Sequence, residues 1–237
     1  MTFHTPRRSA GSSSAGVQVD VTAPIATLEV GWPDNRDGPA TEAWRALAAA
    51  LTSLSKRDDV KCIVLQGTRG GAPAAQRGAA DALAPDSVEA RAFQADAIAS
   101  ALRALRASRH PIVALVEGAC VGWGLEIATC CDLRVCGESS RFGAAVDASR
   151  LGGVYDELRP LAQLLGPTTA LERVLDGGML GAERAQLLGL VNRVAPDAGL
   201  REQAYGLAAR VAAGAPLVNR WHKQAVRRLY GQVPLVL

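Results

Sequence analysis

The hydrophobic positions of the chain change their spacing from one segment to the next. Apolar and polar residues alternate over Val17–Val21 and Ile25–Val30, and a period of two is the pattern of a half-buried strand. Apolar residues then recur at helical spacing at Trp44, Leu47, Leu51 and Leu54. The pattern therefore predicts a pair of strands, followed by an amphipathic helix that has Thr41 as its N-cap and runs to about Leu54.

Two largely apolar segments indicate buried strands. They are Val60–Gln66, which ends at Gly67, and Ile112–Val116. Residues 68–85 between them are rich in Gly, Ala and Pro and have no period, which is typical of a loop. A second helix is predicted over Val88–Ala107. Strands and helices thus alternate, which favours an α/β architecture.

The second apolar run leads into the stretch around which the chain is organised, residues 111–134. Gly118, Gly122 and Gly124 form a loop, and Leu125–Cys131 follows as a predicted buried helix. A strand that runs into the N-terminus of a helix directs backbone N–H groups toward one point, where they hold a negatively charged oxygen. Glu126 lies on the first turn of this helix. The stretch therefore predicts an acid beside an oxyanion site.

The last third of the chain is largely helical. Helices are predicted over Leu158–Leu165, Thr168–Leu175, Ala182–Leu188, Leu200–Ala213 and Val218–Tyr230, with short strands at Leu133–Cys136, Arg141–Gly143 and Leu190–Val194. We expect a flexible N-terminal tail over residues 1–16, an α/β core that holds the site over residues 17–195, and a helical C-terminal region over residues 196–237.

Composition and charge narrow the class of protein. The net charge is 26 − 23 = +3 over 237 residues, and this mild excess gives no reason to expect a nucleic-acid partner. The apolar runs are too short to span a membrane. The five cysteines lie in apolar runs without CxxC or Cys/His pairing, which predicts core thiols in a reducing, cytoplasmic compartment and no metal site.

Three segments resemble the crotonase (enoyl-CoA hydratase/isomerase) superfamily. They are Asp59–Gly67, His110–Arg134 and Leu175–Pro196, and the resemblance covers about residues 20–229. It implies a spiral of ββα units, assembled as a homotrimer or homohexamer through the C-terminal helices, and an enzyme of fatty acid metabolism. It also implies an acyl-CoA thioester as substrate, with coenzyme A as part of that substrate and no separate cofactor.

The resemblance further implies two backbone N–H groups that stabilise the enolate of the thioester. Counting back three residues from Glu126 places one donor at Trp123, where relatives usually have glycine, with Gly122 beside it in the substrate site. Because only proline lacks the backbone N–H, the donor persists in tryptophan. Two roles are open for the indole: it narrows the acyl pocket, or it serves packing or a trimer contact.

The other donor is expected in the loop after Gly67. Relatives show Phe-x-x-Gly-x-Asp-Leu there, and this chain offers the longer segment Gln76–Leu83 without the Phe. Ala80 is the preferred position and Ala79 the alternative, with Asp81 next to them in the substrate site. The opposing interpretation is a loop that no longer forms the site.

Of two catalytic glutamates in the family, the first matches Glu126. Relatives usually show Pro-Glu at the second position, where this chain has Ala145-Val146-Asp147. Counting forward from Phe142 gives Val146 and counting back from Leu151 gives Ala148, so Asp147 is the candidate replacement acid. A surface position for Asp147 is the alternative, because an aspartate is one methylene shorter and proton-transfer geometry is strict.

Lys223 occupies the place where the family often has a basic residue near the coenzyme A phosphates, and its helix also carries Arg220, Arg227 and Arg228. The alternative is a solvated basic face.

The sequence therefore favours an enoyl-CoA hydratase in which Glu126 activates the water and Asp147 exchanges the proton next to the thioester. Isomerase or other single-carboxylate enolate chemistry, and a non-catalytic acyl-CoA-binding protein, are the competing hypotheses.

Overall fold

The computed structural model describes residues 12–14, 16–31, 41–67, 88–143 and 154–229. The predicted sites at Ala79, Ala80, Asp81 and Asp147 lie outside these residues. No helix in the described segments is both long enough and apolar enough to cross a membrane.

A seven-stranded sheet forms the centre of the molecule, in the order β1-β2-β3-β4-β5-β7-β10. Its strands are β1 Ser12–Ser14, β2 Val17–Thr22, β3 Ile25–Val30, β4 Cys62–Gly67, β5 Ile112–Val116, β7 Leu133–Gly137 and β10 Arg193–Ala195. The strands β1 to β3 pair antiparallel, and each pair from β3 to β10 is parallel. Strands β4 and β5 are buried along their whole length, as parallel strands covered on both faces require.

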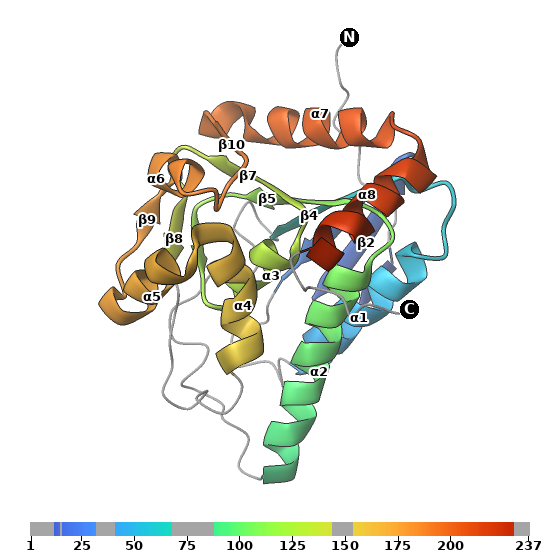
Figure 1. Cartoon of the computed structure of the whole chain (residues 1–237). Helices are drawn as coiled ribbons and strands as arrows, with labels where there is room; N and C mark the ends of the chain where they lie inside the picture. The colour runs from blue at the N-terminus through green and yellow to red at the C-terminus, as the bar shows by residue number, and fades with distance from the viewer. Residues whose placement is uncertain (1–11, 15, 32–40, 68–87, 144–153, 230–237) are drawn as a thin grey trace.

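Helices α1 Thr41–Leu54, α2 Val88–Ala107 and α3 Trp123–Cys130 cover one face of the sheet (Figure 1). Alternate side chains of β4 point to opposite faces, so Ile63 and Leu65 join the core under these helices. Trp44 and Leu47 of α1 are fully buried in the same core. This core therefore packs α3 beside α2, on the same face of the sheet.

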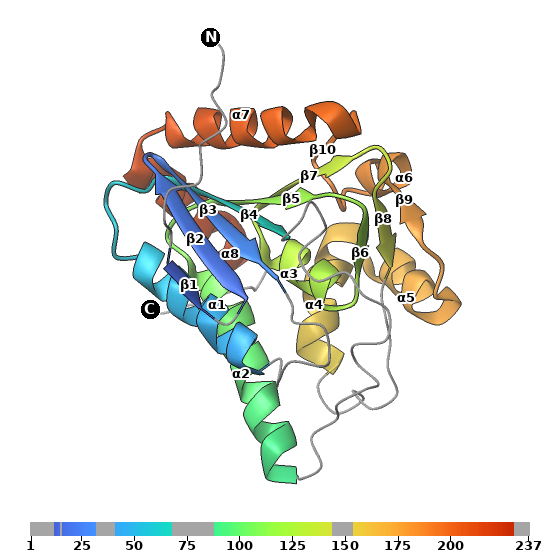
Figure 2. The same ribbon diagram turned by 180° about the vertical axis from the view of Figure 1, so that it is seen from behind.

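Helix α7, Leu200–Ala212, crosses the opposite face of the sheet (Figures 1 and 2). The intervening side chains of β4, Cys62 and Val64, pack there against Leu200 and Ala208. The final described helix, α8 Pro216–Leu229, turns back toward the ends of α1 and α2.

A second, three-stranded sheet has the order β6-β8-β9 and lies beside the main sheet. Its strands are β6 Ala119–Val121, β8 Arg141–Gly143 and β9 Leu180–Gly181, and its neighbouring helices are α4 Val154–Leu165, α5 Pro167–Asp176 and α6 Ala182–Leu187. A short 3-10 helix over Asp197–Gly199 precedes α7. The arrangement confirms the expected α/β architecture with a helical C-terminal region.

Several boundaries differ from the sequence prediction. Helix α4 begins at Val154, four residues before the predicted Leu158, and the short strands β6 and β9 were not predicted. Within residues 1–16, Ser12–Ser14 pair with β2. Thr41 is the first residue of α1 and not its cap, and α3 begins at Trp123, two residues earlier than predicted. The strand predicted over Leu190–Val194 is β10 at Arg193–Ala195, because the N–H groups of Leu190 and Val191 instead donate to the Ala185 carbonyl and close the turn after α6.

Candidate active site

The site is built at the N-terminus of α3. Gly122 precedes the helix with φ 55° and ψ −126°, a conformation that glycine adopts without steric cost, and its N–H donates to Gly143 O at 3.3 Å. The first intrahelical bond runs from Glu126 N to Gly122 O at 3.2 Å. The N–H groups of Trp123, Gly124 and Leu125 therefore precede the helical ladder and lie at the end that carries the positive helix dipole.

Glu126 lies on the first turn of this helix. Its neighbours Leu125 and Ile127 are buried, and Glu126 itself is half-buried, with its Oε2 atom shielded from solvent. A general acid or base has to lie within hydrogen-bond reach of the group with which it exchanges a proton. The position of Glu126 thus suits a general acid or base.

The Trp123 indole packs against Trp44 of α1. The ring centroids are 5.1 Å apart and the planes meet at 75°, which is the favourable edge-to-face arrangement. Trp44 is only 1% exposed, so one side of the Trp123 ring is fixed by the core. Because residues three apart are neighbours on a helix, Trp123 and Glu126 share one side of α3. The packing role proposed for the indole is therefore present, and it occurs beside the candidate acid.

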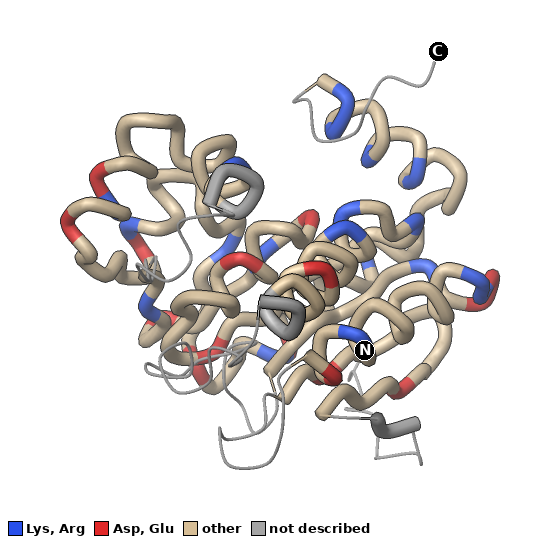
Figure 3. The backbone as a smooth tube through the Cα atoms, turned by 90° about the horizontal axis from the view of Figure 1, so that it is seen from below, with Lys and Arg blue, Asp and Glu red and all other residues tan. Residues whose placement is uncertain are grey.

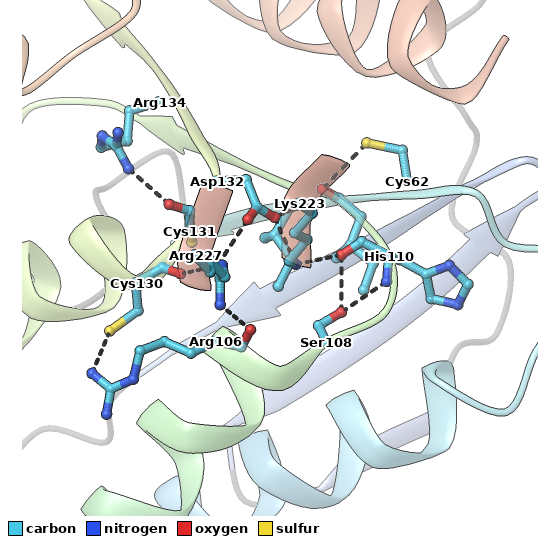
Figure 4. A network of polar contacts seen from close by, with 12 residues as sticks. Cys62, Arg106, Ser108, His110, Cys130, Cys131, Asp132, Arg134, Lys223 and Arg227 are labelled. Carbon is cyan, nitrogen blue, oxygen red and sulfur yellow. Dashed lines mark hydrogen bonds and ion pairs between the residues drawn. The ribbon is translucent and has the colours of Figure 1, made fainter. Parts of the chain in front are cut away.

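Lys223 of α8 is held inside the molecule (Figure 4). Its Nζ is 2.7 Å from Asp132 Oδ2, with the lysine side chain 7% exposed, and it donates to the His110 carbonyl at 2.9 Å. Burial lowers the pKa of the ammonium group, and the charge of Asp132 opposes that shift. Contact with a coenzyme A phosphate stays a prediction, since the described partners of Lys223 are protein groups.

Asp132, Arg134 and Arg227 form an anchor at the other end of α3 that sequence reasoning did not identify. All three are largely withdrawn from solvent, and Arg134 is 4% exposed. The available signal was the run Cys131-Asp132-Leu133-Arg134, in which two charges stand inside an apolar segment. Charged groups that are buried with their segment need partners. Asp132 pairs with Lys223 and Arg227, and Arg134 donates to the carbonyls of Ala128, Cys131 and Leu190.

The cysteines do not supply a nucleophile. All five are buried, which confirms their predicted place in the core. Burial raises the pKa of the Cys62, Cys120 and Cys136 thiols to about 12 and that of Cys130 to about 11, and it raises the pKa of Cys131 as well. These thiols stay protonated near neutral pH. In the described segments, no three His, Cys, Asp or Glu side chains gather as metal ligands.

The comparisons with known proteins agree with the geometry. Residues 26–233 match the family model for enoyl-CoA hydratase/isomerase. A Mycobacterium tuberculosis protein named probable enoyl-CoA hydratase is 32% identical in an alignment of 198 positions that covers 79% of this chain and 68% of that protein.

Two solved structures extend the comparison. An enoyl-CoA hydratase/carnithine racemase from Magnetospirillum magneticum has a TM-score of 0.81 at 34% identity, covering 94% of this chain and 84% of its own. A monofunctional enoyl-CoA isomerase from M. smegmatis has a TM-score of 0.74 at 24% identity, covering 93% of this chain and 96% of its own, and at that identity it speaks for the fold alone. By its family match, its relatives and its fold, this chain belongs to the enoyl-CoA hydratase/isomerase family.

Proposed function

We propose that the protein is an enoyl-CoA hydratase. In this reaction the oxygen of water bonds to C3 of an enoyl-CoA thioester, the 2,3-double bond shifts its electrons toward the carbonyl, and the resulting enolate takes a proton at C2. Negative charge therefore develops on the thioester oxygen. Fixed N–H donors at that oxygen lower the barrier, by about 3 kcal/mol for a single donor in the best-measured case.

One observation carries the proposal: Glu126 stands on the first turn of α3, half-buried between apolar neighbours, at the helix end where the N–H groups of the first turn lie. A proton-transfer group and an oxyanion-binding helix end are thus three residues apart. The family relatives named enoyl-CoA hydratase support the same reaction.

In the proposed mechanism each predicted residue has one task. Glu126 activates the water, Asp147 exchanges the proton at C2, and the N–H groups of Trp123 and Ala80 hold the enolate oxygen. Ala79, Asp81 and Gly122 line the substrate, and Lys223 lies toward the coenzyme A phosphates. We propose that coenzyme A enters as part of the substrate, that no separate cofactor takes part, and that the protein acts in the cytoplasm.

Replacement of Glu126 tests this function. We expect Glu126→Gln to lower kcat for crotonyl-CoA hydration by about 10²–10⁴-fold, the usual contribution of a positioned acid or base. The assay follows the loss of the conjugated thioester absorbance. Glu138→Gln is the matched control, because Glu138 is an exposed acid in the turn before β8. Equal hydration rates in the wild type and in Glu126→Gln would rule the assignment out.

Isomerisation is the second candidate, and the sequence Ala145-Val146-Asp147 in place of Pro-Glu favours it. A single carboxylate that removes and returns a proton shifts a double bond without adding water. Supplying a 3-enoyl-CoA and following the appearance of the 2-enoyl product distinguishes the two. Tight binding of both thioesters without turnover would instead indicate an acyl-CoA-binding protein.

We also propose that the chain assembles with copies of itself, as a trimer or a dimer of trimers. Two exposed apolar surfaces support this. One is Leu217, Trp221 and Leu229 on α8, and the other is Leu171, Leu175 and Leu187 on α5 and α6. They lie at opposite sides of the molecule (Figure 1), and a contact between unlike surfaces that is repeated by rotation closes a ring.

Sedimentation velocity tests this assembly. Trp221→Gln and Leu175→Gln, one on each surface, are both expected to weaken it. A wild-type protein that stays monomeric at every concentration contradicts the proposal.

A further inference from the structure

The C-terminal end of α3 is closed by two arginine side chains. Arg134 Nη1 donates to Ala128 O at 3.2 Å and to Cys131 O at 2.8 Å, and Arg227 Nη2 donates to Cys130 O at 3.2 Å. The last carbonyls of a helix have no partner within it and carry the negative end of its dipole. Cationic donors at these atoms therefore stabilise the helix end and fix where it lies.

Arg227 reaches this end from α8, far away in the sequence (Figure 4). Its Nη2 also donates to Asp132 Oδ1 at 2.8 Å, and its Nη1 donates to the carbonyl of Arg106 at the end of α2. The other oxygen of Asp132 accepts from Ile112 N at 2.8 Å and pairs with Lys223. One guanidinium thus joins the ends of α2 and α3 to Asp132, the second residue after α3.

Helix α8 is turned so that polar side chains face inward. Asn219, Lys223 and Arg227 recur every four residues and form one stripe, and basic residues recur along the helix (Figure 3). Asn219 Nδ2 donates to Val211 O at 2.8 Å. Leu217 and Trp221 are 79% and 66% exposed. Directional bonds, and not apolar burial, therefore set the contact of α8 with α3.

The length of α3 makes its far end sensitive to this contact. The helix has eight residues, so it is about 12 Å long at 1.5 Å per residue. Its N-cap, Gly122, makes no side-chain capping bond. A displacement at the carbonyl end of so short a helix moves Glu126 with it, and a misplacement of about 1 Å can cost 10²-fold in rate.

We propose that Arg227 is a positioning residue: by holding the carbonyl end of α3, it sets where Glu126 and the Trp123 N–H stand relative to the substrate. This role rests on the proposed function for its kinetic consequence. It differs from a contact with coenzyme A, because a residue that positions α3 changes turnover, whereas a residue that binds coenzyme A changes substrate affinity.

The test compares Arg227→Gln with Arg210→Gln. Arg210 is an exposed arginine in the last turn of α7 and is the matched control. We expect Arg227→Gln to lower kcat for crotonyl-CoA hydration by about 10–100-fold, the scale of a sub-ångström to 1 Å misplacement, with KM nearly unchanged. Arg210→Gln keeps the wild-type kcat. A rise in KM at constant kcat overturns the positioning role.

A rescue experiment separates positioning from a general loss of structure. Arg227→Lys keeps the charge near Asp132 but reaches fewer acceptors, so its kcat falls between the wild type and Arg227→Gln. If Arg227→Gln does not fold, Arg227→Lys carries the test, and wild-type kcat in this variant contradicts the role. Methylguanidinium at millimolar concentration raises the activity of Arg227→Ala, and sodium chloride at the same concentration does not. Equal effects of the two salts overturn the proposal.

A readout without turnover keeps this inference separate from the proposed function. Replacing Trp32 and Trp221 by Phe leaves Trp44 and Trp123 as the remaining two of four tryptophans, and their near-ultraviolet circular dichroism reports the placement of α3 against α1. We expect Arg227→Gln to change this signal and Arg210→Gln to preserve it. A wild type that fails to hydrate thioesters contradicts the function alone, whereas identical signals in both variants contradict the positioning role.

Discussion

Two consecutive helices, α7 and α8, attach to the same body by opposite means. Helix α7 presents Leu200, Ala204 and Ala208 to the sheet, and all three are essentially inaccessible to solvent. Helix α8 presents Asn219, Lys223 and Arg227 inward and leaves its large apolar side chains outside. The usual distribution of apolar and polar faces holds for α7 and is inverted in α8.

This difference between α7 and α8 suggests that one helix mainly stabilises the fold and the other mainly fixes the position of its neighbour. Burial of apolar surface is favourable at about 25 cal/mol per Å² but has no preferred direction, so α7 mainly contributes stability to the sheet. A buried ion pair contributes little net stability relative to apolar side chains, yet it fixes geometry because its hydrogen bonds are directional. Helix α8 accordingly determines the position of α3.

Removal of Asp132 should produce the largest change. Asp132→Ala leaves the charges of Lys223 and Arg227 buried without their counter-charge, and we expect a loss of about 4 kcal/mol in the free energy of unfolding. Urea denaturation at neutral pH measures it. Asp132→Asn retains an acceptor and should lose less. A loss below about 1 kcal/mol for Asp132→Ala would show that the anchor does not hold α8.

Truncation of Leu200 in α7 should have the next largest effect. Leu200→Ala opens a cavity against the sheet, and we expect a loss of about 3 kcal/mol in the free energy of unfolding without a change in kcat per folded molecule. Leu187→Ala is the control, measured on protein dilute enough to be monomeric, because Leu187 is 79% exposed in the single chain. A lower kcat in Leu200→Ala, measured where the variant is fully folded, would show that α7 also affects the position of the active site.

The free energy of unfolding should also depend on pH through His110, whose carbonyl accepts from Lys223, but to a smaller extent. Burial lowers the pKa of His110 from its ordinary value of 6.5. As the pH falls from 6.5 toward the lowered pKa, the unfolded chain binds a proton that the folded chain does not, so stability decreases; above 6.5 this contribution is absent. His110→Gln should reduce the difference between the free energies of unfolding at pH 7.5 and pH 5.5. The control His222→Gln should leave that difference unchanged. An unchanged slope in His110→Gln refutes this origin.

The outer face of α8 should have the smallest effect on the fold. Leu217→Gln alters a side chain that is 79% exposed, and we expect the free energy of unfolding at high dilution to change by no more than about 0.5 kcal/mol. Thermal denaturation of the dilute protein measures it. A loss comparable to that of Leu200→Ala would mean that α8 is held by apolar contacts after all.

Local patterns were sufficient for much of the fold. The ranges predicted for β4, β5, α1 and α2 agree with the structure within about two residues, because alternation and helical spacing reflect which side chains are buried. The position of β10 could not be read from its apolar residues. Leu190 and Val191 have strand composition, but their backbone closes the turn after α6.

In the candidate site, too, local patterns predicted some residues and not others. Glu126 was found because its helix and glycine loop form a local motif, and the position of Trp123 followed only by counting from it, since a backbone donor has no side-chain signature. The pairing of Asp132 with Arg227 joins residues 95 positions apart. No local pattern encodes such a contact. For the basic residues of α8 the sequence predicted either a ligand contact or a solvated face, and it did not predict this internal anchor.

In the proposed reaction Glu126 activates the water that adds to an enoyl thioester, and the product formed from crotonyl-CoA in deuterated water measures this role most directly. Nuclear magnetic resonance follows the hydroxyl at C3 and the deuterium at C2 in the wild type and in Glu126→Gln. We predict a 3-hydroxyacyl product with one deuterium at C2 in the wild type, and a rate lower by about 10²–10⁴-fold in Glu126→Gln. The same product at the same rate in both proteins would contradict this role of Glu126.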